Sequence, residues 1–224
     1  MSALLDKYSA DIPNSCTLMA ADFSEGMVKQ VEASKTSAVA AGKTRWDRLQ
    51  TKVLNAMDMQ GVPDASQSHV TAGWVYFMTP DPQKCLSESL RILKPDGVLA
   101  LSSWEGNQWL DVVTHSFAQV RPDKTMPSLP ANWSHVELLK QEVEKAGFRD
   151  VQAERVSVSM QYEKHEVLVE WLLTKMPFVL ALTKDMSEEE MGRLREAAVQ
   201  KCREFCPSEP GELTGWSLLA VGRK

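Results

Sequence analysis

No long hydrophobic run occurs in the 224 residues of this sequence. About 18 apolar residues without charge are needed to cross a membrane, so we expect no transmembrane helix. The opening residues, MSALLDKYSADIPNS, lack a basic flank and a long apolar core, so we also expect no secretory signal. The net charge of −5 argues against nucleic acid or an anionic membrane as a main partner.

Cysteine is scarce as well, with four scattered residues: Cys16, Cys85, Cys202 and Cys206. Without an export signal, we expect them to be reduced thiols in a cytoplasmic protein. Cys202 and Cys206 lie four apart on a predicted helix, which places both on one face. A metal site there would need about two further ligands, and the sequence offers no matching His or Cys pair. We therefore expect no metal site.

Glycine is absent from the first 21 residues. This absence matters because residues 16–22, CTLMAAD, are an apolar run closed by an acid, with a helix start directly behind it. Such a run is typical of a buried parallel strand that leads into a helix at the carboxyl edge of an α/β sheet. In nucleotide-binding folds that acid accepts hydrogen bonds from a ribose and follows a glycine-rich turn by about 20 residues. Asp22 is therefore a candidate ribose-binding acid whose usual glycine-rich turn does not precede it.

The remaining chain alternates predicted strands with predicted helices. The strands are 16–21, 52–56, 68–77, 98–104, 151–162 and 214–221; the helices are 24–34, 80–93, 108–119, 134–146, 165–177 and 187–205, with the end of another at 2–8 and a loop at 42–48. This alternation predicts an α/β fold with a mostly parallel sheet, a helical cover and an antiparallel edge strand. We predict a core at 1–162, a helical lid at 163–212 and a final sheet strand at 213–224.

Four motifs in order resemble the class I S-adenosylmethionine-dependent methyltransferases, especially the small-molecule enzymes of fungal and microbial metabolism. They are ADFSEGM at 21–27, NAMDM at 55–59, VPDASQSHVTAGWVYFMTPDP at 62–82 and SLRILKPDGVLALSSW at 89–104. The resemblance covers about residues 1–105 and implies a Rossmann-like fold with S-adenosylmethionine as cofactor.

The resemblance also implies roles for particular residues. Asp22, with its neighbour Phe23, would bind the ribose, and Asp58 would accept a hydrogen bond from the adenine amino group. Met59 would offer its backbone N–H to the adenine ring. Acceptor-only carboxylates suit such donors. The plainer alternatives are a helix N-terminal acid for Asp22 and a turn former for Asp58.

The end of the strand at 68–77 carries the next implied site. Gly73 and Trp74 would face the methionine part of the cofactor, and Tyr76 would face the substrate. A general base could be needed to take the proton of the accepting atom. His115, on the helix after the strand at 98–104, is the candidate base, and a solvated helical histidine is the alternative.

Aromatic residues near the same edge predict a substrate pocket. Trp104 and Trp109 would line it, and His135 would open a segment that folds over it. Ordinary core packing is the alternative for both tryptophans.

The sequence departs from the family in one respect. The family's first strand, between those holding Asp22 and His69, and its glycine-rich turn do not precede Asp22 here. We expect the first strand to be missing, which leaves ladder groups on both neighbours unpaired. The neighbours could close up, a second chain could supply a strand in a homodimer or with another partner chain, or the gene model could be incomplete.

Three functions remain open at this stage. The first is methyl transfer to a small, largely apolar metabolite with S-adenosylmethionine as cofactor. The second is a pseudo-methyltransferase that has lost the cofactor and catalyses a cyclisation or isomerisation. The third is a non-catalytic subunit that pairs with a methyltransferase.

Overall fold

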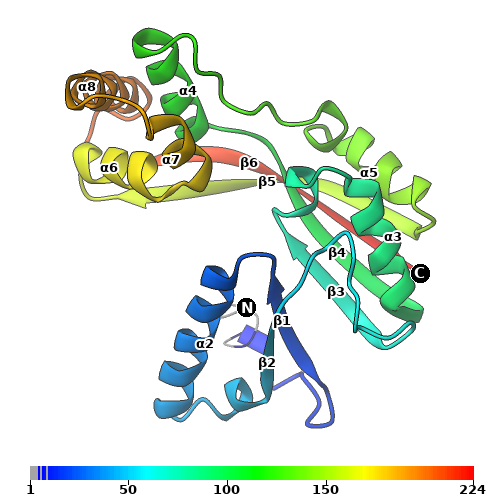
Figure 1. The fold of residues 1–224 in the computed structure, drawn as a ribbon. Coiled ribbons are helices and arrows are strands. Elements are labelled where there is room, and N and C mark those ends of the chain that lie inside the picture. The colour runs from blue at the N-terminus through cyan, green and yellow to red at the C-terminus, as the bar shows by residue number, and fades with distance from the viewer. Residues whose placement is uncertain (1–4, 6, 9) are drawn as a thin grey trace.

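The structure is a computed structural model that describes residues 5, 7, 8 and 10–224. Its strands form two separate sheets (Figure 1). The bounds are β1 Leu18–Asp22, β2 Leu49–Val53, β3 Gln67–Gly73, β4 Leu93–Asn107, β5 Arg149–Tyr162 and β6 Gly211–Arg223. The smaller sheet is the parallel pair β1–β2, and the larger has the order β3-β4-β6-β5. In the larger sheet β3 and β4 are parallel, whereas β6 is antiparallel to both of its neighbours.

The helices fall into three groups (Figure 1). Their bounds are α2 Glu25–Ala40, α3 Pro82–Ile92, α4 Gln108–Val120, α5 Val136–Lys145, α6 His165–Lys175, α7 Pro177–Thr183 and α8 Glu188–Phe205, with short 3₁₀ turns at Thr44–Arg48, Tyr76–Met78 and Ala131–Trp133. Helix α2 packs on the small sheet, α3 and α5 lie along the large sheet, and α4 gathers with α6, α7 and α8 at one end of it. None of the described helices is long and apolar enough to cross a membrane.

Local side chains fix where the main helices begin. Asp81 accepts a hydrogen bond from the Lys84 amide at the start of α3, where Pro82 occupies the first turn. The side chain of Asn107 accepts one from the Leu110 amide at the start of α4. Helix α8 begins with a full capping box between Ser187 and Glu190. The residues that cap these helix starts can therefore be recognised in the sequence.

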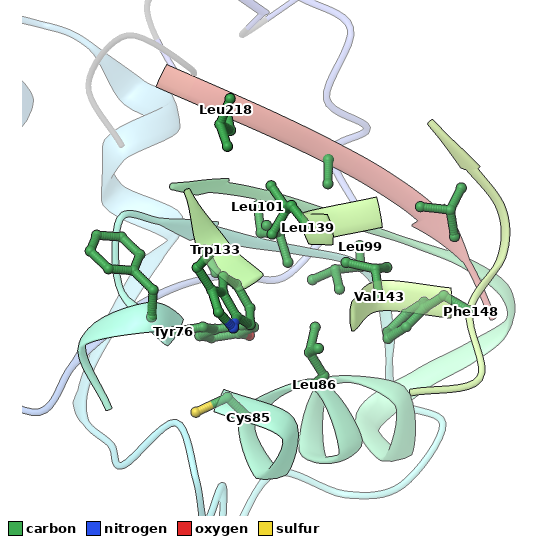
Figure 2. Packing of buried hydrophobic residues seen from close by; sticks show 14 of the residues in the cluster. Tyr76, Cys85, Leu86, Leu99, Leu101, Trp133, Leu139, Val143, Phe148 and Leu218 are labelled. Carbon is green, nitrogen blue, oxygen red and sulfur yellow. The ribbon is translucent and has the colours of Figure 1, made fainter. Parts of the chain in front are cut away.

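The large sheet has its main core between its strands and the pair α3 and α5. Figure 2 shows Leu86 of α3 and Leu139 of α5 pointing toward Leu99 and Leu101 of β4. All four side chains are buried. Burying a leucine contributes about 1.5–3 kcal/mol, so this cluster is a major source of stability for the large sheet.

A second core joins the end of the large sheet to the lid helices. Its members come from α4, α6, α7 and α8 and from the paired ends of β5 and β6. They include Trp109, Val113, Phe117, Leu172, Val179, Leu194, Leu213 and Tyr162. The predicted lid, 163–212, contains α6, α7 and α8, but α4 shares their core.

The small sheet packs against a much smaller hydrophobic cluster than the large sheet does. Its cluster is built on Leu5, Trp46 and Leu49. Trp46 lies in the stretch predicted as a loop, 42–48, where residues 44–48 form a 3₁₀ turn that turns the indole inward. Because the residues around Trp46 are polar, the sequence pattern gave no indication that its side chain is buried.

The α/β class and the parallel strands are confirmed, and the edge strand β5 pairs antiparallel with β6. Several boundaries differ from the prediction. Helix α2 runs to Ala40 and not to residue 34, β2 is Leu49–Val53 and not 52–56, and β4 spans Leu93–Asn107 and not 98–104. The helix predicted at 165–177 ends at Lys175, since proline has no backbone N–H to continue a helix and is suited to the first position of a new one, α7. The predicted strand 68–77 ends at Gly73 and is followed by a 3₁₀ turn. The helix end predicted at 2–8 lies largely outside the described residues.

The two strands expected to flank the family's first strand, β1 and β3, do not pair with each other. Within the described part of the chain, β1 pairs with β2 alone and β3 pairs with β4 alone. Each therefore keeps one free edge of backbone N–H and C=O groups. Such an edge accepts another strand readily.

Candidate functional site

The two predicted acids lie at one edge of the small sheet. Asp22 is the last residue of β1, paired with Val53, the last residue of β2. Because the strands are parallel, the loop after β2, which carries Asp58, leaves from the same edge as Asp22. One Asp22 carboxylate oxygen accepts the Ser24 amide at 2.8 Å, so the other oxygen remains for a ligand. Phe23 beside it is 76% exposed, a large apolar surface open to a partner molecule.

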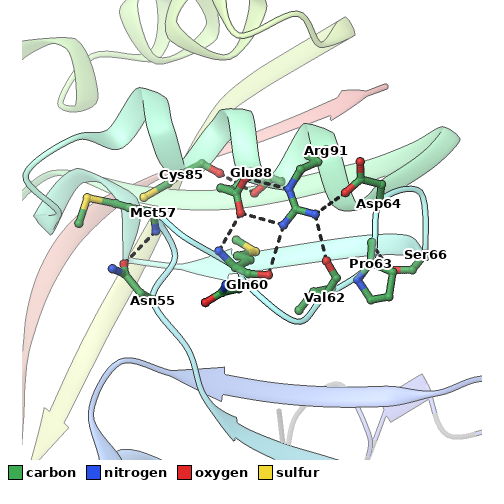
Figure 3. A network of polar contacts seen from close by, with 12 residues as sticks. Asn55, Met57, Gln60, Val62, Pro63, Asp64, Ser66, Cys85, Glu88 and Arg91 are labelled. Carbon is green, nitrogen blue, oxygen red and sulfur yellow. Dashed lines mark hydrogen bonds and ion pairs between the residues drawn. The ribbon is translucent and has the colours of Figure 1, made fainter.

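The amide of Met59 is already occupied. It donates to the carboxylate of Glu88 on α3 at 2.7 Å (Figure 3). The pKa of the Glu88 carboxyl is lowered, chiefly by hydrogen bonds from Arg91 and further by this amide. The role that the resemblance implies for the Met59 amide would require Glu88 to release it.

Three tryptophans meet at the carboxyl edge of the large sheet. Trp74 stacks on Trp104 with ring centroids 4.9 Å apart and planes only 3° from parallel. The edge of Trp109 meets Trp104 at 5.3 Å and 84°. Trp74 directly follows the end of β3, Trp104 lies within the last residues of β4, and Trp109 lies in the first turn of α4. The sequence predicted all three near this edge, and the structure brings them into one contiguous group, which we call the tryptophan cluster.

Trp74 is held in an unusual conformation. Its φ is +51°, in the left-handed region that bulky residues rarely adopt. Two serines hold it there: its amide donates to Ser102 Oγ at 3.0 Å, and its indole N–H donates to Ser217 Oγ at 3.2 Å. Trp74 nevertheless stays 41% exposed. Backbone strain held in place by several contacts clusters at ligand sites, and here it presents an open aromatic face.

The structure does not bring every predicted site residue to this cluster. Tyr76 points into the main core, where its hydroxyl lies 2.5 Å from Ser89 Oγ. Burial raises the pKa of Tyr76 to about 12, which does not suit a base at neutral pH. The ring of His115 contacts Gln119 at 2.9 Å on the helix that packs against α8. His135 is exposed just before α5, and Gly73 is exposed at the end of β3, next to Trp74.

Two sets of functional contacts were missed by sequence reasoning. Ser102 and Ser217 are small polar residues inside apolar strands, and nothing local indicates that they hold an indole. Glu88 and Arg91 stand three apart on a helix, a spacing that places both side chains on one face. That spacing could have flagged the pair, although not its target, the loop after β2.

A separate polar cluster surrounds Cys206 at the end of α8. Its pKa is lowered to about 7, first by the Tyr162 hydroxyl, then by the Glu212 amide and Ser208. Gly211 makes this approach possible, because an added Cβ there would lie 2.7 Å from the Tyr162 hydroxyl oxygen and 2.8 Å from Cys206 Sγ. All four cysteines are free thiols, and the described residues contain no group of three or more His, Cys, Asp or Glu placed to hold a metal ion.

Comparison with known proteins gives a consistent result. A family profile described as "Methyltransferase domain" matches residues 3–101. The methyltransferase ucsB of Acremonium sp is 35% identical over 223 residues, covering 99% of this chain and 77% of that protein. The acetylaranotin bis-thiomethyltransferase of Aspergillus terreus is 27% identical over 142 residues, covering 60% of this chain and 46% of that protein.

A solved structure shows the same fold. The YcgJ protein of Bacillus subtilis superposes with a TM-score of 0.53 at 17% sequence identity, covering 93% of this chain and 82% of that one.

Proposed function

This chain belongs to the S-adenosylmethionine-dependent methyltransferase family, with its Rossmann-like fold, and from that premise we propose that it methylates a flat, largely apolar secondary metabolite. The observation that carries the proposal is the placement of Asp22 and Asp58 at one strand edge and of the tryptophan cluster at another. The name of the relative from Aspergillus terreus supports a secondary-metabolite substrate.

The adenosine half of the cofactor fits the edge of the small sheet. The free oxygen of Asp22 would accept from the ribose hydroxyls, and the exposed Asp58 would accept from the adenine amino group. Phe23 would supply an apolar surface beside the ring. When bound, S-adenosylmethionine supplies an electrophilic methyl group on a sulfonium. The chain's own part is to hold the two reactants in line.

The substrate would lie on the tryptophan cluster. The exposed Trp74 indole offers a flat face, and stacked or edge-on rings contribute about 0.5–1.5 kcal/mol beyond the area they bury. Gly73 leaves open space, since an added Cβ there would meet nothing within 4 Å. Because the Tyr76 hydroxyl pairs with Ser89 in the main core and the His115 ring pairs with Gln119, the proposal rests on positioning and not on a general base.

We also propose that a strand from outside the described residues pairs with the free edges of β1 and β3. The free edges of β1 and β3 support insertion of one further strand between them, from a second copy of the chain or from another polypeptide segment. Light scattering tests the first source. A dimer whose β3 amides are protected from exchange supports a strand from a second copy, and a stable monomer argues against it.

Relatives named as methyltransferases do not favour the cofactor-free alternative. We also place the protein in a reducing compartment such as the cytosol, which is supported by its four free thiols.

The test is calorimetric titration of the purified protein with S-adenosylmethionine. We expect binding that weakens by tenfold or more in Asp22→Ala and Asp58→Ala, because each variant removes a charge-assisted hydrogen bond. Asp123→Ala is the matched control, since that carboxylate pairs with Arg121 instead. A folded protein that does not bind the cofactor would refute the proposal.

A further inference from the structure

One loop carries the chain from the small sheet to the large one. Residues 54–66 lie between β2 and β3, which belong to different sheets. Since no strand bridges the sheets in the described residues, the position of this loop sets where the edge with Asp22 and Asp58 stands relative to the tryptophan cluster. Whatever fixes the loop therefore fixes the candidate cofactor site.

Apolar packing fixes part of the loop. Met59 and Val62 are buried against Ile92 at the end of α3. Met19 of β1 and Val70 of β3 pack against the same cluster. Side chains from both sheets thus meet at the end of α3.

A charged pair on α3 then holds the loop backbone (Figure 3). Arg91 donates to both Glu88 oxygens at 2.8 Å, a bidentate contact within one helix face. The same guanidinium donates to the Met59 carbonyl at 3.2 Å and to the Val62 carbonyl at 3.0 Å. Its contact with Asp64 adds an ion pair at the far end of the loop.

Glu88 binds the N–H group of the same Met59 residue. Its carboxylate accepts the Met59 amide at 2.7 Å, so both the N–H and the C=O of Met59 are bound to α3. The Glu88 side chain is 18% exposed and that of Arg91 31%, so solvent screens this pair less than a fully exposed one. Met59 directly follows Asp58 in the chain.

We propose that Glu88 and Arg91 are positioning residues for the cofactor: they hold the Met59 peptide and so place the Asp58 carboxylate where the adenine binds. This inference rests on the proposed function. It also gives the Met59 amide a different role from the one that the resemblance implies, since the amide serves as an anchor point for the loop.

The test compares three variants by titration with S-adenosylmethionine and by hydrogen exchange. Glu88→Ala removes the acceptor, and we expect the Kd to rise about tenfold. Glu88→Gln keeps a carbonyl oxygen for the Met59 amide and should recover part of that loss. Arg91→Lys loses the bidentate geometry and should resemble Glu88→Ala. Exchange at the Met59 amide should accelerate about tenfold in Glu88→Ala, without a change in the midpoint of unfolding of the large sheet.

The matched control is Glu170→Ala, which breaks an exposed pair with Arg195 in the lid and should leave the Kd unchanged. If the wild-type protein binds the cofactor and all three variants bind it within twofold of wild type, the inference is overturned while the proposed function stands. If Glu88→Ala does not fold, Glu88→Gln and Arg91→Lys decide in the same way. If wild type does not bind the cofactor, the proposed function fails, and the cofactor role of the pair fails with it.

Discussion

The large and small sheets of this protein are stabilised to very different degrees. Helix α3, which packs on the large sheet, buries four of its 11 residues, whereas α2 on the small sheet buries only Val28 among its 16. Among the described strands, β4 and β6 of the large sheet are paired on both edges, and neither strand of the small sheet is. Two-stranded units without a broad apolar face are marginally stable. Stability is thus concentrated in the half that carries the tryptophan cluster.

The difference shows how the candidate site is divided. The acids proposed to hold the adenosine stand on the weakly packed half, and the aromatic platform stands on the strongly packed half. Cofactor affinity then depends on what joins the halves. In the described residues these joining elements are the apolar cluster around Met59 and the Glu88–Arg91 pair.

Paired leucine truncations test this contrast most strongly. Leu86→Ala, in the main core, should lower the free energy of unfolding by about 3 kcal/mol, since a buried Leu→Ala change costs 2–5 kcal/mol. Leu49→Ala, in the small cluster, should leave that main transition nearly unchanged and accelerate exchange in β1 and β2. Urea unfolding followed by far-UV circular dichroism, together with hydrogen exchange, measures both. Equal losses in the main transition would show that the halves unfold as one unit.

Cofactor binding should reduce the contrast between the halves. At 100 times its Kd, a ligand that binds only the folded form adds about 2.7 kcal/mol of stability. We expect S-adenosylmethionine to slow amide exchange in β1, β2 and residues 54–66, with little change in α8. Exchange followed by mass spectrometry, with and without the cofactor, measures this. Protection confined to the lid would contradict the assignment of Asp22 and Asp58 to the cofactor.

Two glycine substitutions should act with opposite sign in the two halves. At Gly215 an added Cβ would lie 2.5 Å from Asn107 Cβ and 2.9 Å from the Trp109 ring, so Gly215→Ala should cost about 1–3 kcal/mol through overpacking. At Gly26, near the start of α2, the nearest atom would be Ser24 Oγ at 3.6 Å, so Gly26→Ala should stabilise the helix by about 0.5 kcal/mol. Thermal unfolding measures the effect of Gly215→Ala, and amide exchange rates in α2 measure the effect of Gly26→Ala. A destabilising Gly26→Ala would mean that α2 is more tightly packed than its single buried residue indicates.

Thiol labelling gives the mildest test. Only the thiolate reacts, so Cys206, with a pKa near 7, should be about half reactive at pH 7, and its rate should level off above about pH 8. Removing the phenol in Tyr162→Phe should raise this pKa and slow labelling at pH 7. Burial raises the pKa of Cys202 to about 12, and that thiol should label only when the lid opens. Iodoacetamide labelling read by mass spectrometry follows each site, and a Cys206 rate that still climbs tenfold between pH 8 and 9 would contradict the lowered pKa.

Local patterns predicted much of the fold but less of the site. Periodicity placed nearly every strand and helix, and the capping residues of α3 and α8 are visible in the sequence. The strand-end rule placed Asp22 and Asp58 at one edge. The sequence did not indicate that Tyr76 is buried, because the strand ends early at Gly73 and the ring then lies in the core. It did not indicate that Trp46 is buried, because Trp46 lies in a 3₁₀ turn and not in an apolar pattern.

The sequence by itself therefore determined the order of the elements, the two candidate acids and the family, since hydrophobic periods, helix caps and strand ends are local properties. Only the tertiary structure decided that Trp74 stacks on Trp104, that Glu88 binds the Met59 amide and that β1 and β3 each keep an edge that no described strand pairs with. Those contacts join residues that lie about 30 positions apart or that belong to different sheets. Their energies depend on which side chains the packed fold brings within a few ångströms, and no local pattern encodes that distance.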